Sequence, residues 1–202
     1  SMQSQQAVKP YTFDNASQGV LAACQMVNSE SVMSMEILPQ ARRPKVLIVE
    51  RQLLHYRQEF YEGLRSILDK AGIDLQLLIG DGTPAEALKK NQISLDWAMR
   101  IPTHYLFGTS LCWQPFGQYA KDADLVIVMH ENKILYNLWL MSFGRPKRLA
   151  FWGHGRNMQS DSPNGFKERF KRWTINRVDW WFAYTKTSAA LAGGTYTDEL
   201  PS

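Results

Sequence analysis

The sequence predicts an α/β protein whose core is a parallel sheet covered by helices on both faces. Strand-like and helix-like segments alternate about five times after residue 44. The strand-like segments are continuous apolar runs, such as KVLIV at 45–49 and DLVIVMH at 124–130, instead of alternating apolar and polar residues. Strands of this kind are buried on both faces, which is typical of a doubly wound, Rossmann-like sheet.

The first strand leads into a predicted helix over residues 57–72. Within it, Phe60, Leu64 and Leu68 recur at helical spacing, and Gly72 stands where the helix should end. Residues 73–80 form the second predicted strand.

The middle of the chain is less regular. The second strand should end at the Asp81-Gly82 pair, which favours a tight turn. We expect a further strand between Trp97 and Leu106, although its apolar pattern is weaker. Residues 117–123 predict a short helix before the strand at 124–130.

The second half continues the alternation. We predict helices over 132–144, 164–178 and 186–194, a strand with its following loop over 146–155, and a strand over 179–185. Together these elements make residues 44–194 one Rossmann-like domain. Residues 1–43 are rich in Gln, Ser, Ala, Met and Asn and have a weak apolar pattern, so we expect a flexible or loosely docked arm.

Composition argues against several classes of protein. Cys24 and Cys112 lie far apart without CxxC or Cys/His spacing, which disfavours a disulfide scaffold or a structural zinc site and suits a reducing compartment. No apolar run approaches the roughly 20 residues of a membrane span, and the first residues do not resemble a secretion signal. We therefore expect a cytoplasmic protein.

Familiar nucleotide-binding and hydrolase motifs are missing. The chain has no GxxxxGK[ST] loop, no GxGxxG after the first strand and no GxSxG elbow. His130, Glu131 and His154 lack the spacing of known metal motifs, so we expect no metal, and the sequence requires no other cofactor.

Polar residues follow the predicted strands at their carboxyl ends, where doubly wound sheets bind ligands. The candidates for substrate binding or catalysis are Tyr56 and Arg57, then His130, Glu131 and Asn132, and finally Gly153, His154, Gly155 and Arg156. Each has a structural alternative. His130 could be a buried imidazole satisfied by its neighbours, and Arg57 could lie on the solvent face of a helix.

Four segments in this order resemble a known family. They are KVLIVERQLLHYRQEFYEGL (45–64), DADLVIVMHENKILYNLW (122–139), RLAFWGHGRN (148–157) and DWWFAYTKTSAALAGG (179–194). They are similar to the N-terminal domain of bacterial GT-B glycosyltransferases, in particular the retaining family that builds lipopolysaccharide, capsule and related glycans. The resemblance covers about residues 43–202.

The resemblance implies one half of a two-domain enzyme. This domain would supply the acceptor side of the cleft, and a C-terminal domain, for which residues 195–202 would begin the linker, would bind the nucleotide-sugar donor. His154 would lie beside the transferred sugar, and Glu131 with Asn132 near a glycan or lipid-linked acceptor. The loop after the first strand departs from many relatives, because it carries His55, Tyr56 and Arg57 where they have glycines.

A basic segment surrounds the WGHG stretch. Residues 145–177 contain nine Lys or Arg against two acidic residues, although the net charge of the whole chain is only +4. Such a segment can attract an anionic membrane, which would make the enzyme peripheral on the inner face of the cytoplasmic membrane.

Two other functions stay open. One is a non-catalytic α/β ligand-binding module. The other is a nucleic-acid-binding domain that uses residues 145–177; the absence of RRM, KH and helix-turn-helix signatures disfavours it, and we expect no nucleic-acid partner.

The WGHG stretch generates a first prediction. Gly153 and Gly155 permit a sharp turn that would direct the His154 imidazole toward a ligand. In the full-length enzyme, His154→Ala should lower turnover roughly tenfold to a thousandfold, the scale of one lost transition-state contact, and leave the melting temperature unchanged. An active but unstable variant would show that His154 has a structural role instead.

Overall fold

The computed structural model describes residues 18–22, 42–89, 92–131, 133–153, 174 and 177–183. The strands are β1 (Lys45–Glu50), β2 (Asp74–Ile79), β3 (Met99–Arg100), β4 (His104–Leu106), β5 (Leu111–Trp113), β6 (Leu125–Met129), β7 (Leu149–Gly153) and β8 (Trp180–Ala183). The helices are the 3-10 helix η1 (His55–Arg57), α2 (Gln58–Lys70), α3 (Pro84–Ala87), α4 (Gly117–Ala120) and α5 (Leu135–Phe143). Residues 18–22 are also helical.

Six strands form one parallel sheet in the order β3-β2-β1-β6-β7-β8. Counted along the chain within this sheet, the order is 3-2-1-4-5-6, the strand order of the Rossmann fold. The doubly wound α/β class predicted from the sequence is therefore confirmed. The chain reverses its direction of travel across the sheet between β1 and β6, which are direct neighbours.

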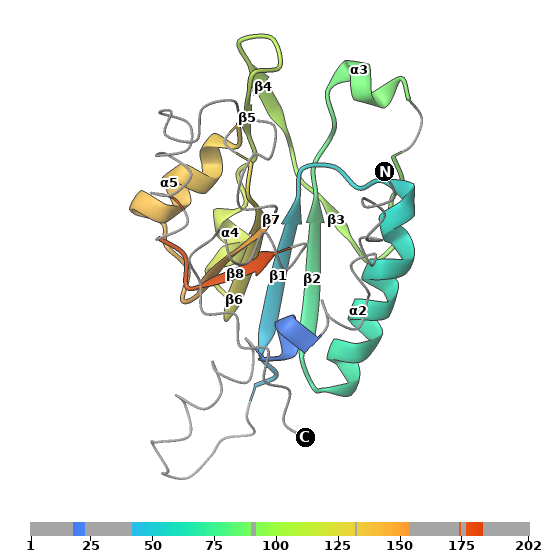
Figure 1. Ribbon diagram of the computed structural model, residues 1–202, viewed down its shortest axis with the longest axis vertical. Helices are drawn as coiled ribbons and strands as arrows, with labels where there is room; N and C mark the ends of the chain where they lie inside the picture. Colours follow the sequence, from blue (N-terminus) through green and yellow to red (C-terminus); the bar gives the residue numbers. More distant parts are fainter. Residues whose placement is uncertain are drawn as a thin grey trace, which may run out of the picture.

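Each face of the sheet has its own apolar layer. On one face, Val46 and Ile48 of β1 pack in the same cluster as Leu64 and Leu68 of α2. On the other face, Leu47 of β1 joins a cluster built on α4 and α5. Figure 1 shows α2 on one side of the strands and α4 with α5 on the other. The strands read as unbroken apolar runs because alternate side chains enter opposite layers and both layers are covered.

The helix predicted over residues 57–72 is present, but the α-helix begins at Gln58. A turn of 3-10 helix, η1, precedes α2, and the helix stops at Lys70. Gly72 follows with a φ of +74°, a conformation that glycine adopts without strain, and its N–H donates to the Asp69 carbonyl. The expected glycine stop is confirmed.

The single strand expected between Trp97 and Leu106 is wrong. The structure has two short strands there: β3 pairs with β2 in the main sheet, and β4 pairs with β5 in a separate antiparallel hairpin. Pro102 lies between them, and because proline has no N–H it interrupts a strand.

Sequence reasoning also missed α3 and β5. The short helix α3 begins with a capping box, in which the Thr83 hydroxyl accepts from the Glu86 N–H and the Glu86 carboxylate accepts from the Thr83 N–H. The Thr-Pro-Ala-Glu run at 83–86 is the sequence signature of such a box, so α3 could have been predicted.

Several predicted elements fall partly or wholly outside the described residues. These are the arm at 1–43 apart from 18–22 and 42–43, the helix at 164–178 apart from 174, 177 and 178, the helix at 186–194, and the start of a linker at 195–202. Residue 132 of the predicted helix at 132–144, residues 154–155 of the segment at 146–155 and residues 184–185 of the strand at 179–185 lie outside them too. Within the arm, Val20 is buried in the same apolar cluster as α2. No helix in the described part of the chain is long and apolar enough to cross a membrane.

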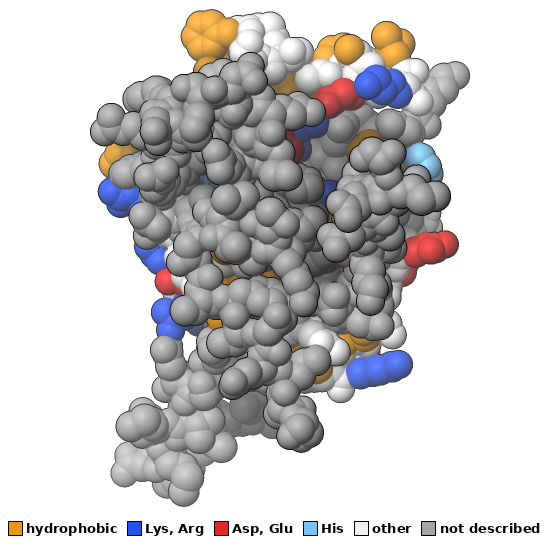
Figure 2. All heavy atoms as spheres, in the orientation of Figure 1, with side chains coloured by type: hydrophobic (Ala, Val, Ile, Leu, Met, Phe, Trp, Pro, Cys, Tyr) orange, Lys and Arg blue, Asp and Glu red, His pale blue; other side chains and the backbone are white. Residues whose placement is uncertain are grey.

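The β4–β5 hairpin stands at the end of the molecule toward which the carboxyl ends of β1 and β2 point, as does α3 (Figure 1). Hydrophobic side chains are exposed at this end (Figure 2). Phe107, at the hairpin tip, is 83% exposed and has a φ of 51°. A bulky residue in this left-handed region is strained, and Phe107 gains little burial in return.

The strain at Phe107 generates a prediction. Phe107→Asn should raise the free energy of unfolding by about 0.5–1 kcal/mol, because asparagine adopts positive φ more readily and little packing is lost. Urea unfolding measures the change. The control is Phe143→Asn, which replaces an equally exposed phenylalanine in α5 and should bring no gain. A destabilised Phe107→Asn variant would contradict the prediction.

Candidate functional site

The carboxyl ends of β1, β6 and β7 bring four of the predicted residues to one edge of the sheet. Arg57 Nη1 lies 3.9 Å from the sulfur of Met129, the last residue of β6. The N–H of His130 donates to the carbonyl of Trp152 in β7, and a Cβ added to Gly153 would lie 3.1 Å from the His130 Cβ. Glu131 follows His130 on the same edge. We call this region the carboxyl edge.

Glu50, Arg57 and Tyr61 form a buried cluster at the end of β1. The Glu50 carboxylate is 3% exposed; it accepts from Arg57 at 2.5 Å and from the Tyr61 hydroxyl. Burial raises the pKa of Glu50, while the Arg57 charge and the Tyr61 hydrogen bond act in the opposite direction. Arg57 therefore does not lie free on the solvent face of a helix. A buried carboxylate holds it at the carboxyl edge.

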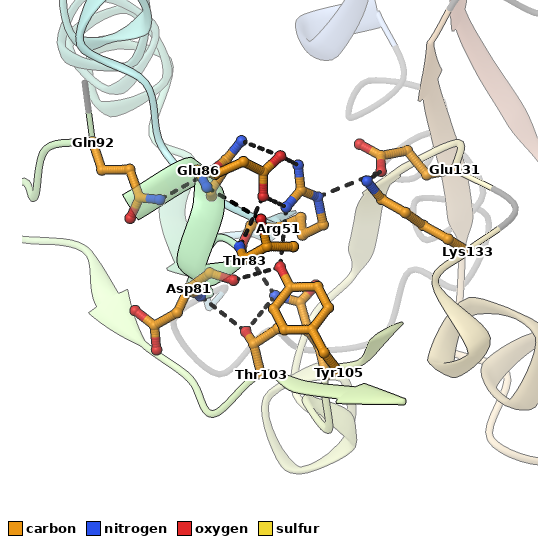
Figure 3. A network of polar contacts seen from close by, with 11 residues as sticks. Arg51, Asp81, Thr83, Glu86, Gln92, Thr103, Tyr105, Glu131 and Lys133 are labelled. Atoms are coloured by element: carbon orange, nitrogen blue, oxygen red, sulfur yellow. Dashed lines mark hydrogen bonds and ion pairs between the residues drawn. The ribbon is translucent and has the colours of Figure 1, made fainter. Parts of the chain in front are cut away.

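Arg51, which follows β1 but is not among the predicted site residues, is the centre of a second network (Figure 3). Its guanidinium makes a bidentate pair with Glu86, with N–O distances of 2.7 and 2.8 Å, and also donates to the Tyr105 hydroxyl at 3.0 Å. The Tyr105 hydroxyl in turn donates to the Asp81 carbonyl at 2.8 Å. Arg51 thereby joins the loop after β1 to α3, to the loop after β2 and to the hairpin.

The Arg51–Glu86 pair is strongly charge-assisted. Burial disfavours the charge on Arg51, but its hydrogen bonds to Glu86 and Tyr105 outweigh that effect and raise its pKa. The hydrogen bonds from Arg51 lower the pKa of Glu86 to about 2, against the opposing effect of burial. A single arginine after a strand does not indicate in the sequence that it will pair with Glu86.

Gly80 allows the loops after β1 and β2 to approach each other. The Thr103 hydroxyl accepts from the Asp81 N–H at 2.9 Å and from the Gln114 amide at 3.0 Å. A Cβ on Gly80 would collide with the side chains of Thr103 and Gln114 and would come within 2.7 Å of the Arg51 carbonyl oxygen. Only glycine fits between these groups.

The His130 ring is held in place by its neighbours, unlike the ring of a catalytic base that is free to reach a substrate. Its Nε2 lies 3.1 Å from the Thr174 hydroxyl, and its ring contacts Phe151 and Trp181 at centroid distances of 4.9 and 4.7 Å. His130, Glu131 and Thr174 line a pocket of about 10 Å³, which is room for about one water molecule. A ligand larger than a water molecule does not fit in this pocket.

Glu131 contacts two cations. Its Oε2 lies 3.1 Å from Lys133 Nζ and 3.5 Å from Arg51 Nε. The side chain is 32% exposed, so this carboxylate borders solvent at the carboxyl edge.

The remaining predicted residues are less informative. Tyr56 is in η1, with a side chain that is 65% exposed and an edge contact to His55. Asn132, His154, Gly155 and Arg156 lie outside the described residues. Within the described ranges, no three His, Cys, Asp or Glu side chains are grouped so that they could hold a metal ion.

Part of the basic segment at 145–177 is also described. Arg145 pairs with Asp179 at 2.8 Å, and Lys147 pairs with Asp124 at 2.9 Å. These two cations are engaged within the protein, which reduces what they can offer to nucleic acid or to a membrane.

No family model, curated protein or solved structure matches this chain. What the fold and the carboxyl edge define is a class: a Rossmann-like α/β domain with ionic and imidazole side chains at the reversal of strand order.

The Arg51–Glu86 pair generates a prediction about pH. A carboxyl whose pKa is lower in the folded than in the unfolded state contributes stability above its unfolded pKa, near 4.5, and loses it as the pH falls toward about 2. Glu86→Gln should therefore cost on the order of 2–3 kcal/mol at pH 7, and its difference from wild type should shrink between pH 5 and pH 2.

Urea unfolding at several pH values tests this. The control is Asp81→Asn, which removes an exposed carboxylate 2.8 Å from Arg100 and should change stability by less than about 1 kcal/mol. A Glu86→Gln difference that stays constant from pH 7 to pH 2 would contradict the assignment.

Proposed function

We propose that this domain is the acceptor-binding half of a GT-B glycosyltransferase of the retaining type. The parent enzyme would transfer a sugar from a nucleotide-sugar to a glycan or lipid-linked acceptor of the bacterial cell envelope, with the donor held mainly by a second domain. It would act in the cytoplasm or at the inner face of the cytoplasmic membrane.

The observation that carries the proposal is the convergence at the carboxyl edge. His130, Glu131 and Gly153 lie at the ends of the adjacent strands β6 and β7, where the strand order reverses. Arg57 of η1 is held beside them by Glu50 at the end of β1 and contacts Met129 of β6. This is the position at which doubly wound sheets bind ligands. Together with the four segments that resemble the glycosyltransferase family, it favours a sugar-containing ligand.

In this reaction the main task of the domain is to position the acceptor. The sugar–phosphate bond of a nucleotide-sugar already has a good leaving group, so the protein must orient the acceptor hydroxyl and stabilise charge in the transition state. Glu131, partly exposed at the edge, can accept a hydrogen bond from a sugar hydroxyl, and His154 would follow directly after Gly153. In a retaining reaction the departing phosphate can take the acceptor proton, so no base is assigned.

A non-catalytic ligand-binding module is the second candidate. It is favoured because charged groups at the edge are engaged within the protein: Arg57 is paired with Glu50, and Glu131 contacts Arg51 and Lys133. A module of this kind would bind its ligand without any requirement for a nucleotide-sugar.

The proposal predicts acceptor binding without turnover by the 202-residue chain. Incubation with nucleotide-sugars and lipid-linked acceptors should give no transfer, and calorimetry should show binding of at least one acceptor. Tyr56→Ala should weaken that binding about tenfold, because its ring is exposed in η1, next to Arg57 in the chain.

The matched control is Phe143→Ala, an exposed aromatic residue at the far end of α5, which should leave acceptor binding unchanged. Multiple turnover by this chain alone would overturn the two-domain proposal. If the full-length coding product binds glycans but never transfers sugar from any nucleotide-sugar, the non-catalytic module is correct.

A further inference from the structure

Arg51 has a buried donor that no hydrogen bond satisfies within the part of the chain that the structure describes. The side chain is only 8% exposed, and its Nε–H makes no hydrogen bond to a described residue, although the Nη atoms are engaged by Glu86 and Tyr105. Buried donors are almost always paired, and leaving one unpaired is costly. An unpaired arginine donor at the reversal of strand order therefore needs an explanation.

The Nε–H faces the carboxylate of Glu131 but falls short of it. The distance from Nε to Oε2 is 3.5 Å, whereas Lys133 Nζ reaches the same oxygen at 3.1 Å. Figure 3 shows the guanidinium between Glu86 on one side and Glu131 with Lys133 on the other. Two cationic donors thus converge on one partly exposed position, which the Glu131 carboxylate occupies imperfectly.

We propose that Arg51 Nε and Lys133 Nζ form a binding site for an oxyanion, the phosphate or carboxylate group of a ligand, which displaces the Glu131 carboxylate. Arginine and lysine are the usual ligands of both groups, and the Nε edge of a guanidinium suits a planar or tetrahedral oxyanion.

Charge balance favours an oxyanion that replaces the Glu131 carboxylate over one that binds beside it. Arg51, Lys133, Glu86 and Glu131 together carry no net charge, so a further anion would meet repulsion from Glu131 as long as that side chain stays in place. An oxyanion in the place of Glu131 restores the balance and can supply the hydrogen bond that Arg51 Nε lacks. The displaced Glu131 would then turn into solvent at the carboxyl edge.

The inference goes beyond the proposed function and does not depend on it. It concerns an anionic group on any ligand, and it is tested without a nucleotide-sugar or a glycan. A failure here leaves the proposed function standing, and the reverse also holds.

The test measures binding of inorganic phosphate and of acetate to the full chain by calorimetry, with chloride as the background anion. Glu131→Gln keeps the size of the side chain and removes the competing charge, so phosphate or acetate should bind about tenfold more tightly than to wild type. The anion that gains more identifies the ligand group as phosphate or carboxylate. Adding Lys133→Ala to Glu131→Gln should reverse the gain.

Asp81→Asn is the matched control, because it removes one carboxylate from the same end of the sheet without touching Arg51 or Lys133. An equal gain in that variant would show a general charge effect and overturn the site. No gain for either anion in Glu131→Gln would overturn it as well.

A spectroscopic readout separates the site from a structural role of Glu131. In arginine-selective ¹⁵N spectra, the Nε–H resonance of Arg51 should shift on addition of the bound anion, and that of Arg100 should not. If Glu131 only stabilises the fold, Glu131→Gln will lower the melting temperature and no Arg51 shift will follow the anion. That result would contradict the proposal.

Discussion

The register in which β1 pairs with both of its neighbouring strands is the constraint on which the rest of the structure depends. Residues 45–50 pair with 74–79 on one side, and residues 46–49 pair with 125–128 on the other, all in parallel. Strands paired in this way end at nearly the same height, so the residues that follow β1, β2 and β6 meet at one edge. The two apolar layers fix this pairing, since a slip of one residue would exchange the side chains that face α2 and α5.

At the carboxyl edge, most charged side chains are paired with one another instead of being left free in solvent. Glu50 is buried against Arg57 and Tyr61, and Arg51 is buried against Glu86 and Tyr105. A buried pair of this kind contributes modest net stability, but the loss of one partner leaves an uncompensated charge, so the geometry around it is sharply defined. This explains how short, irregular elements such as α3 and the β4–β5 hairpin keep a defined position beside the sheet.

The same organisation bears on function. The Glu50 carboxylate lies 2.5 Å from Arg57, and Glu86 lies 2.7 Å from Arg51, whereas Glu131 lies 3.5 Å from Arg51 Nε and 3.1 Å from Lys133 Nζ. Of these three carboxylates, Glu131 is therefore the one that can change partners at low cost. Its place directly after β6, opposite the residue that follows β1, makes it the link between the proposed acceptor side of a glycosyltransferase cleft and the inferred oxyanion site.

The sequence by itself determined the parallel sheet, the long helix α2 and the edge at which polar residues gather. These follow from local patterns: unbroken apolar runs, helical spacing from Phe60 to Leu68, a glycine stop at Gly72, and His130 and Glu131 directly after a strand. Only the tertiary structure decided the roles of Arg51, Glu86 and Tyr105, because their contacts join residues 35 and 54 positions apart and leave no periodic signal. It also decided that Arg57 turns inward to Glu50 and that Pro102 divides one expected strand into two, since both outcomes depend on which backbone and side-chain groups find partners after the sheet has formed.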